Sequence, residues 1–210
     1  MKKLALISAS LAIAASCFGQ NGAIIFNNRI VGTVVAPVYG PLLSNTGLRL
    51  SGNATTNGGS TDYSGVRTLL VGTGFTAELW AGSSVGSLAP ITMNGKTTFR
   101  TTAVTGFIAA LLTGDAVIPG INAAGTPTVL QVRAWDNQLG TLTTWASVMS
   151  RQDVAQGMSD PFTVSLSPAP PAPSSAMVGL QSFNLTIVPE PGVIALGVLG
   201  LGALLLRRRK

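Results

Sequence analysis

Few residues of this chain could do chemistry, and their types exclude most enzyme mechanisms. The 210 residues include no histidine and a single cysteine. Without histidine the chain lacks the commonest general base, the commonest zinc ligand and every Ser-His-Asp or Cys-His arrangement. A glycosidase would need two carboxylates about 5–9.5 Å apart in a cleft, and a calcium loop would need closely spaced acids. The carboxylates between the two ends of the chain, none at calcium-loop spacing, are Asp62, Glu78, Asp115, Asp136, Asp153 and Asp160. We therefore expect no enzyme, no metal and no cofactor.

The tryptophans offer another kind of chemistry, the stacking of sugar rings on aromatic faces. Trp80, Trp135 and Trp145 are the three tryptophans of the chain. If exposed, they would form a ligand platform with Arg133 and Asp136 as polar partners, and the chain would be a carbohydrate-binding module. In the simpler interpretation, Asp136 bonds its own backbone in a turn and Trp135 is half-buried.

Strands must position these side chains. Residues 127–135 alternate between small apolar residues and larger ones that include Arg133 and Trp135, as expected for a strand with two different faces. Residues 74–81 alternate in the same way, and we expect Glu78 to point outward. We also expect residues 66–70 to form a hairpin with this second strand.

The sequence predicts short strands, turns and loops for the remaining segments. Residues 119–120 are Pro-Gly and predict a turn, whereas the polar and glycine-rich residues 45–64 predict a long loop. Residues 141–149 fit a strand, although residues 145–156 could instead form a short helix. Further strands are expected over residues 22–29, where the strand enters a turn, and over residues 30–38, 96–104, 161–166 and 180–188. Residues 107–113 fit either a strand, which we favour, or a short helix. This pattern predicts an all-β fold, a single β-sandwich or jelly-roll-like domain over residues 20–188.

The N-terminal residues 1–19 have the composition of a secretory signal peptide. Lys2 and Lys3 precede an apolar stretch, and small residues follow. We expect cleavage after Gly19, which removes Cys17 and leaves a mature protein without thiol chemistry. The alternative is that residues 14–17 act as a weak lipobox and that Cys17 is lipidated.

The C-terminal residues 189–210 combine three features in order. Residues 193–206 are fourteen residues without charge, which as a helix span about 21 Å against a hydrocarbon core of roughly 30 Å. A buried helix of a soluble core is the alternative, but four cations follow this helix directly. The motif before it is Pro189, Glu190, Pro191 and Gly192, and the basic end is Arg207, Arg208, Arg209 and Lys210. The cations act as a stop-transfer signal and favour a cytoplasmic C-terminus.

This tail resembles the PEP-CTERM sorting signal of Gram-negative bacteria. The resemblance implies an exosortase-type membrane transpeptidase as partner, which cuts near Pro189–Pro191 after the export translocon and signal peptidase have acted. Residues 23–29, 74–82 and 132–145 also look like exported cargo proteins that carry this tail. This second resemblance implies only the topology and the destination of the chain, and no activity. The resemblance implies a precursor in the cytoplasmic membrane with residues 20–188 outside, and a non-enzymatic product at the cell surface or in the extracellular polysaccharide matrix.

The charge balance gives no reason to expect a nucleic-acid partner. The formal net charge is +6, but Lys2, Lys3 and the four terminal cations contribute six of the thirteen positive charges. The body between the ends carries seven cations against six acids, a net charge of +1. Isolated cations of this kind do not form the basic patch that phosphate binding needs.

Overall fold

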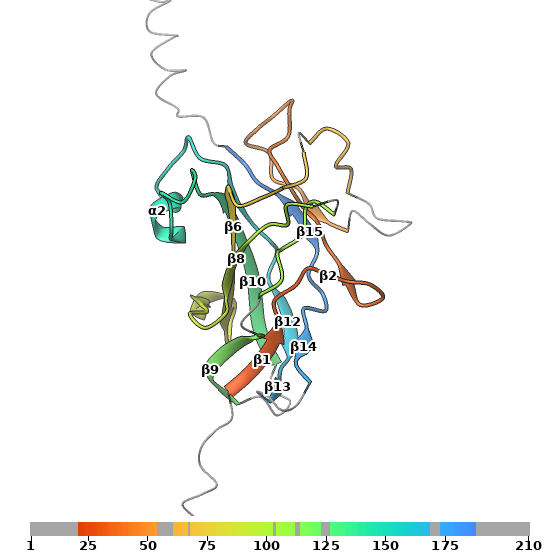
Figure 1. Ribbon diagram of the computed structural model, residues 1–210, viewed down its shortest axis with the longest axis vertical. Helices are drawn as coiled ribbons and strands as arrows, with labels where there is room; N and C mark the ends of the chain where they lie inside the picture. Colours follow the sequence, from red (N-terminus) through yellow and green to blue (C-terminus); the bar gives the residue numbers. More distant parts are fainter. Residues whose placement is uncertain are drawn as a thin grey trace, which may run out of the picture.

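The computed structural model describes residues 21–53, 61–66, 68–102, 104–111, 114–122, 127–168 and 173–187. In this part of the chain, strands account for nearly all regular structure, with one 3-10 turn and one short α-helix (Figure 1). The prediction of an all-β fold is therefore confirmed. The expected signal peptide, residues 1–19 with Cys17, and the expected sorting signal, residues 189–210, lie outside the described residues. No helix among the described residues is long and apolar enough to cross a membrane.

Most strands are short, and two are long enough to organise a sheet. The elements are β1 (Asn21–Ile25), β2 (Arg29–Ile30), β3 (Val34–Val35), β4 (Val38–Tyr39), β5 (Ser51–Gly52), β6 (Phe75–Gly82), η1 (Val85–Ser87), β7 (Ala89–Pro90), β8 (Lys96–Thr98), β9 (Ala116–Asn122), β10 (Pro127–Asp136), α2 (Trp145–Met149), β11 (Gln156–Met158), β12 (Phe162–Ser165), β13 (Ser167–Pro168), β14 (Ser175–Ala176) and β15 (Ser182–Asn184).

The largest sheet is built on the antiparallel pair β6 and β10. Their register runs from Phe75 opposite Asp136 to Gly82 opposite Val129. The outer edge of β10 pairs with β12 along its first half and with β11 along its second half, and β6 pairs with β8 and β7 in the same divided way. The strand predicted over residues 127–135 is confirmed. The hairpin predicted between residues 66–70 and 74–81 is wrong, because the partners of β6 come from later in the chain.

A second sheet surrounds β1, which pairs with β9 on one side and with β13 and β14 on the other. The predicted turn at Pro119 and Gly120 is wrong, because both residues lie inside β9. The register between β1 and β9 shifts beside Asn21, and Gly120 has a φ of 75°, which together mark a bulge. A strand beside a bulge tolerates a proline that has no N–H to donate.

Residues 30–38 contain parts of three short strands, β2, β3 and β4, and a turn instead of one strand. Gly32 adopts a φ of 84° between β2 and β3, which glycine accepts without a steric penalty. The next strand, β4, pairs in parallel with β15, and β15 pairs antiparallel with β5. The long loop predicted over residues 45–64 therefore contains β5, and its residues 54–60 lie outside the described part.

One apolar core joins these sheets. It contains Ile24 and Ile118 from the β1 sheet, Leu79 and Leu130 from the β6–β10 sheet, and Phe183 from β15, all buried. Burial of apolar surface is the main favourable term in folding, at about 25 cal/mol per Å². The small residues Ala77 and Ala134 on the same face let the other sheets approach closely.

A buried asparagine fastens the loop after β1 to two distant segments. The Asn28 side chain is fully buried, and its Nδ2 donates to Ala36 O at 2.7 Å and to Gly106 O at 3.2 Å. Its Oδ1 accepts from the Ile108 N–H at 2.8 Å. One side chain thus satisfies the Ala36 carbonyl and the Ile108 N–H, and it gives a second donor to Gly106 O, which also accepts from the Val38 N–H.

Candidate functional site

The side chains singled out for chemistry gather on the face of the β6–β10 sheet that is turned away from the main core. Cross-strand pairing sets Glu78 opposite Arg133 and Trp80 opposite Gln131, while Trp135 stands two positions further along the same face. Because side chains alternate along a strand, these residues share one side of the sheet. The sequence patterns of residues 74–81 and 127–135 are therefore correct in their periodicity.

Two of the three tryptophans on this side are buried. Trp135 has no exposed surface and Trp145 has 6%. They meet edge to face at 5.9 Å between ring centroids and form a small second core with Leu142, Val148 and Val154. The prediction of an exposed platform is wrong for these two residues, because α2 and its flanking loops cover the sheet here. Trp80 is half-buried at the border of this cluster.

The helix that covers this face begins with a side chain that caps its N-terminus. Thr144 is the N-cap of α2, and its hydroxyl accepts from the Ser147 N–H at 3.2 Å. The alternative of a short helix in this region is therefore confirmed over Trp145–Met149, and a strand over residues 141–149 is wrong. Trp135 Nε1 donates to Leu142 O at 2.9 Å, which fixes the loop just before the helix.

Arg133 lies between indole rings. Its guanidinium carbon is 3.6 Å from the ring centroid of Trp80 and 5.2 Å from that of Trp145. Such contacts contribute about 0.5–2 kcal/mol, the larger figure applying where water is excluded. Nε of Arg133 donates to Gln131 Oε1 at 3.0 Å. Burial lowers the pKa of Arg133, and the Glu78 carboxylate opposes this shift. The side chain stays cationic at neutral pH, because arginine is not deprotonated in proteins.

Glu78 lies on the side of the sheet turned away from the main core, as predicted, but it is buried there, with 7% of its surface exposed. One carboxylate oxygen accepts from Trp80 Nε1 at 2.8 Å. The cross-strand neighbours of Glu78 are Arg133 and Lys96. The Arg133 guanidinium interacts electrostatically with this carboxylate, which offsets part of the cost of its burial, whereas Lys96 Nζ donates to Thr143 O at 3.1 Å.

Asp136 has the structural role that the simpler interpretation gave it. Its Oδ1 accepts from the Gln138 N–H at 2.8 Å, as in a turn. The next residue, Asn137, holds this turn to β6, because its Nδ2 donates to Thr76 Oγ1 at 3.0 Å and to Thr73 O at 2.8 Å. Nothing in the local sequence separates the role of Asn137 from that of an ordinary turn residue.

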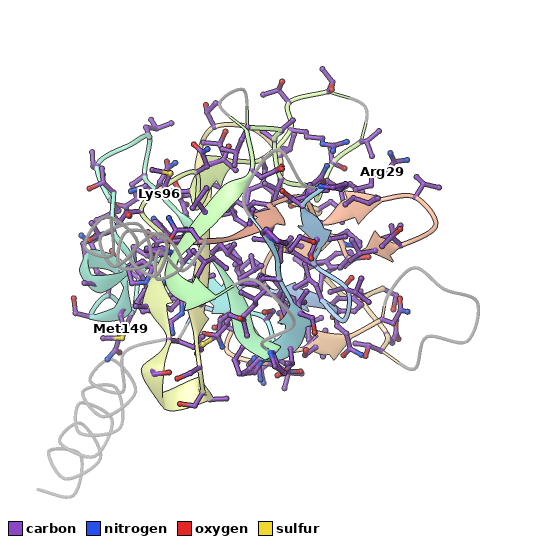
Figure 2. The ribbon with its side chains drawn as sticks, turned by 90° about the horizontal axis from the view of Figure 1, so that it is seen from below. Arg29, Lys96 and Met149 are labelled. Atoms are coloured by element: carbon purple, nitrogen blue, oxygen red, sulfur yellow. The ribbon has the colours of Figure 1, made fainter. Side chains whose placement is uncertain are left out.

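A pocket of about 380 Å³ opens beside this cluster, between α2, β11 and β15. Trp145 and Arg133 lie in its lining together with the exposed Met149 and Met158. Met149 and Lys96 lie on one side of the molecule, and Arg29 on the other (Figure 2). Further lining residues are Arg49, Gln156, Gly157, Asn184 and Thr186.

Next to this pocket, Asp160 carries the clearest ion pair of the site. It accepts from Arg49 at 2.5 Å and from the Ser51 hydroxyl at 2.5 Å. The hydrogen bonds from Ser51 and from Arg49 lower the pKa of Asp160. Both charged side chains are about half exposed, so the pair adds little stability but neutralises Arg49.

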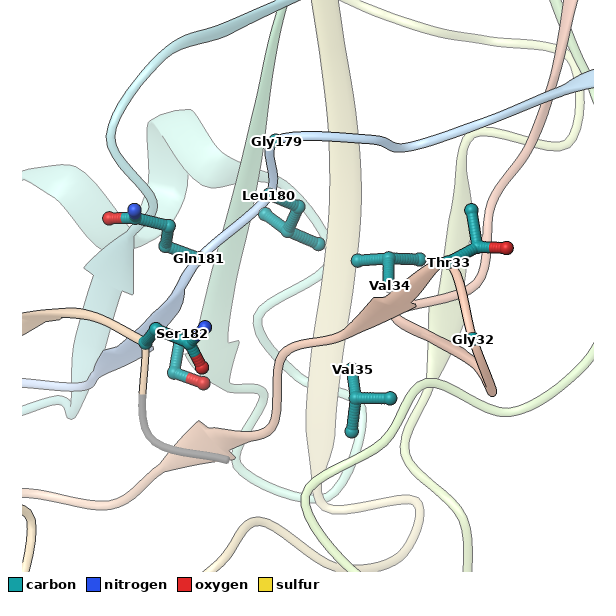
Figure 3. A pocket seen from close by; sticks show the side chains of 9 residues that line it. Gly32, Thr33, Val34, Val35, Gly179, Leu180, Gln181 and Ser182 are labelled. Atoms are coloured by element: carbon teal, nitrogen blue, oxygen red, sulfur yellow. The ribbon is translucent and has the colours of Figure 1, made fainter. Parts of the chain in front are cut away.

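A second hollow of about 460 Å³ lies between β3 and the loop before β15 (Figure 3). Val34 and Leu180 approach it from opposite sides, and Gln181 and Ser182 complete one wall. The Ser182 hydroxyl is buried and has no hydrogen-bond partner among the described residues. The lining carries no charged side chain, so nothing in it favours one class of ligand.

The other predicted site residues belong to the C-terminal segment. Among the described residues there is no group of three or more His, Cys, Asp or Glu side chains that could hold a metal. The sorting-motif residues Pro189, Glu190, Pro191 and Gly192, and the cations Arg207, Arg208, Arg209 and Lys210, lie outside the described residues. No protein-family model, no curated protein and no solved structure matches this chain.

Proposed function

We propose that the chain is a non-enzymatic exported protein, sorted to the cell envelope or the extracellular polysaccharide matrix through its C-terminal segment. The observation that carries this proposal is the order of features at the C-terminus: Pro-Glu-Pro, an apolar stretch of residues 193–206, and four consecutive cations. The signal peptide at residues 1–19 directs the body outward, and the cations keep the tail inside. The sorting enzyme would be an exosortase-type transpeptidase.

The body is suited to this role as a β-sandwich-like unit. Apolar side chains of the β1 sheet and of the β6–β10 sheet meet in one core, which supports two packed sheets. The described chain starts with β1 at one end of the long axis, and its last residues lie at the opposite end (Figure 1). The body would therefore stand with the β1 end away from the membrane.

The distance between body and tail is short. The Leu185 N–H donates to Tyr39 O, and the Ile187 N–H donates to Thr46 O, each at 2.8 Å. Only Val188 separates Ile187 from Pro189. The folded body would lie directly against the membrane surface, where the transpeptidase must reach Glu190. A flexible insertion after Val188 should then speed processing.

Cell fractionation tests the sorting role. The intact chain is compared with a variant that lacks residues 193–206 and with Glu190→Ala in a host that has the sorting enzyme. Asp62→Ala is the matched control, because Asp62 is an exposed acid of the body. We expect both tail variants to lose correct delivery and the control to keep it. Equal delivery of all forms, or a mature protein that retains Arg207–Lys210 by mass spectrometry, would contradict the proposal.

A further inference from the structure

Arg133 has hydrogen-bonding capacity that the described protein does not use. Among the described residues, the only hydrogen bond of its side chain is the one from Nε to Gln131 Oε1. The Glu78 carboxylate faces it across the strands, but the hydrogen bond of that carboxylate goes to Trp80. A guanidinium held against two indole rings keeps its planar edge available for a bidentate partner such as a carboxylate.

The other polar groups of the same pocket already have partners. Gln156 Nε2 donates to Val148 O and Arg151 O, and the Thr186 hydroxyl donates to Gln156 O. The Asn184 side chain donates to Leu48 O and accepts from Leu50 N–H. A ligand rich in hydroxyl groups would find few open partners here, which argues against a neutral sugar.

The remaining surface of the pocket is apolar and adaptable. Met149 and Met158 are 67% and 40% exposed, Met158 stands directly opposite Arg133 in the pairing of β10 with β11, and Trp145 belongs to the same lining. Exposed methionines beside a pocket are unusual for a soluble surface and suit apolar ligands of varied shape, because the thioether chain is flexible and polarisable. This surface would contact the body of a ligand while Arg133 contacts its charge.

The charges around the pocket leave a positive balance. Arg49 is neutralised by Asp160, and Arg151 by Asp153. The lining of the pocket contains two cations, Arg49 and Arg133, and no acid, and Glu78, which stands opposite Arg133 across the strands, is not part of it. Among the described residues Arg133 forms no ion pair, so it is the cation of the lining that is left without one, which favours an anion.

We infer that the pocket between α2, β11 and β15 binds a small organic carboxylate with an aromatic or alkyl body, its charge on Arg133 and its body against Trp145, Met149 and Met158. The volume of about 380 Å³ is within the range of small-molecule sites and accommodates a single-ring acid. This binding activity is independent of the proposed sorting role.

Titration of the full-length chain in a non-ionic detergent tests the inference. The probes are phenylacetate, its uncharged isostere phenylacetamide, and glucuronate, which has a carboxylate on a hydroxyl-rich body. Heat of binding and tryptophan emission are both followed, since Trp80 and Trp145 contact Arg133. We expect phenylacetate to bind in the millimolar range or better, and at least about tenfold more tightly than either other probe.

Three variants separate the contributions. Arg133→Lys keeps the charge but loses the planar fork, and should weaken phenylacetate binding about tenfold. Met149→Ala alters an exposed side chain and should weaken it a few-fold. Arg151→Lys is the control, because Arg151 pairs with Asp153 and does not line the pocket.

Several outcomes overturn the inference. They are no binding of phenylacetate by the folded full-length chain, equal affinity for the acid and the amide, or equal affinity for phenylacetate and glucuronate. Unchanged binding by a folded Arg133→Lys variant does the same. If that variant fails to fold, the contrast between acid and amide on the unaltered chain decides.

Discussion

Replacing Asn28 by alanine should be among the most destabilising single changes in the body. The side chain makes three hydrogen bonds, to Ala36 O, Gly106 O and the Ile108 N–H, and it is fully buried. Alanine would remove all three and leave buried backbone groups without these partners. Gly106 O also accepts from the Val38 N–H, so the main losses fall on Ile108 and Ala36.

The size of the effect follows from these contacts. An orphaned buried backbone group costs about 1–3 kcal/mol, so two of them predict a loss of roughly 3–4 kcal/mol for Asn28→Ala. The matched control is Asn27→Ala. Asn27 is half-buried and accepts from the Arg29 N–H at 2.9 Å and more weakly from Arg100, so we expect about 1 kcal/mol.

Urea unfolding of the full-length chain, followed by tryptophan fluorescence, measures both losses. The midpoint should fall for Asn28→Ala with little change in the slope, because the folded core is the same. Losses for the two asparagine variants that agree within about 0.5 kcal/mol would refute the reasoning, since they would show that burial and the three hydrogen bonds of Asn28 do not matter.

Three further changes have definite expected outcomes. Leu139 has a φ of 58° and is 93% exposed, so Leu139→Gly should raise the free energy of unfolding by about 0.5–1 kcal/mol, whereas Gly140→Ala, at a φ of 91°, should lower it by a similar amount in the same urea assay. The pKa of Asp160 is lowered in the folded chain, so the ionised carboxylate adds to the free energy of unfolding above the unfolded pKa of about 3.9, and this stabilisation is lost as pH falls through the folded pKa. Asp160→Asn should remove this fall in stability at acid pH and should cost roughly 0.5 kcal/mol at neutral pH. Burial raises the pKa of Tyr39 and of Tyr63, the only tyrosines of the chain, so tyrosinate absorbance should stay low near pH 10 in the folded state and appear on unfolding, with stability falling as pH rises further.

The sequence pattern predicted those strands in which core-facing and outward-facing residues alternate regularly. The alternation in residues 127–135 gave the correct faces of β10, and the Asp136 turn followed from residue type alone. The burial of Trp135 and Trp145 could not be predicted, because the cover comes from α2, which lies beyond the turn and is only five residues long. The alternation of residue types shows which side chains share a face of a strand, but it does not show which later segment of the chain packs on that face.

The pairing of segments that are far apart in the sequence could not be predicted from local residue patterns either. Pro119 and Gly120 have the composition of a turn, yet β1 holds them in a bulged strand from almost a hundred positions earlier. The same holds for the pocket beside Arg133. Its lining joins residues from position 49 to position 186, and no spacing in the sequence marks them as neighbours.

The position of β15 has a consequence for the order in which the protein can fold. β15 is the middle strand between β4 and β5, so those two early strands have no common partner until residues 182–184 are available. A chain that emerges from its N-terminus must therefore hold β4 and β5 as open edges while most of its length is still being delivered. Completion of the fold depends on contacts of very high sequence separation, which makes folding slow and leaves the incomplete chain open to aggregation and to chaperone binding.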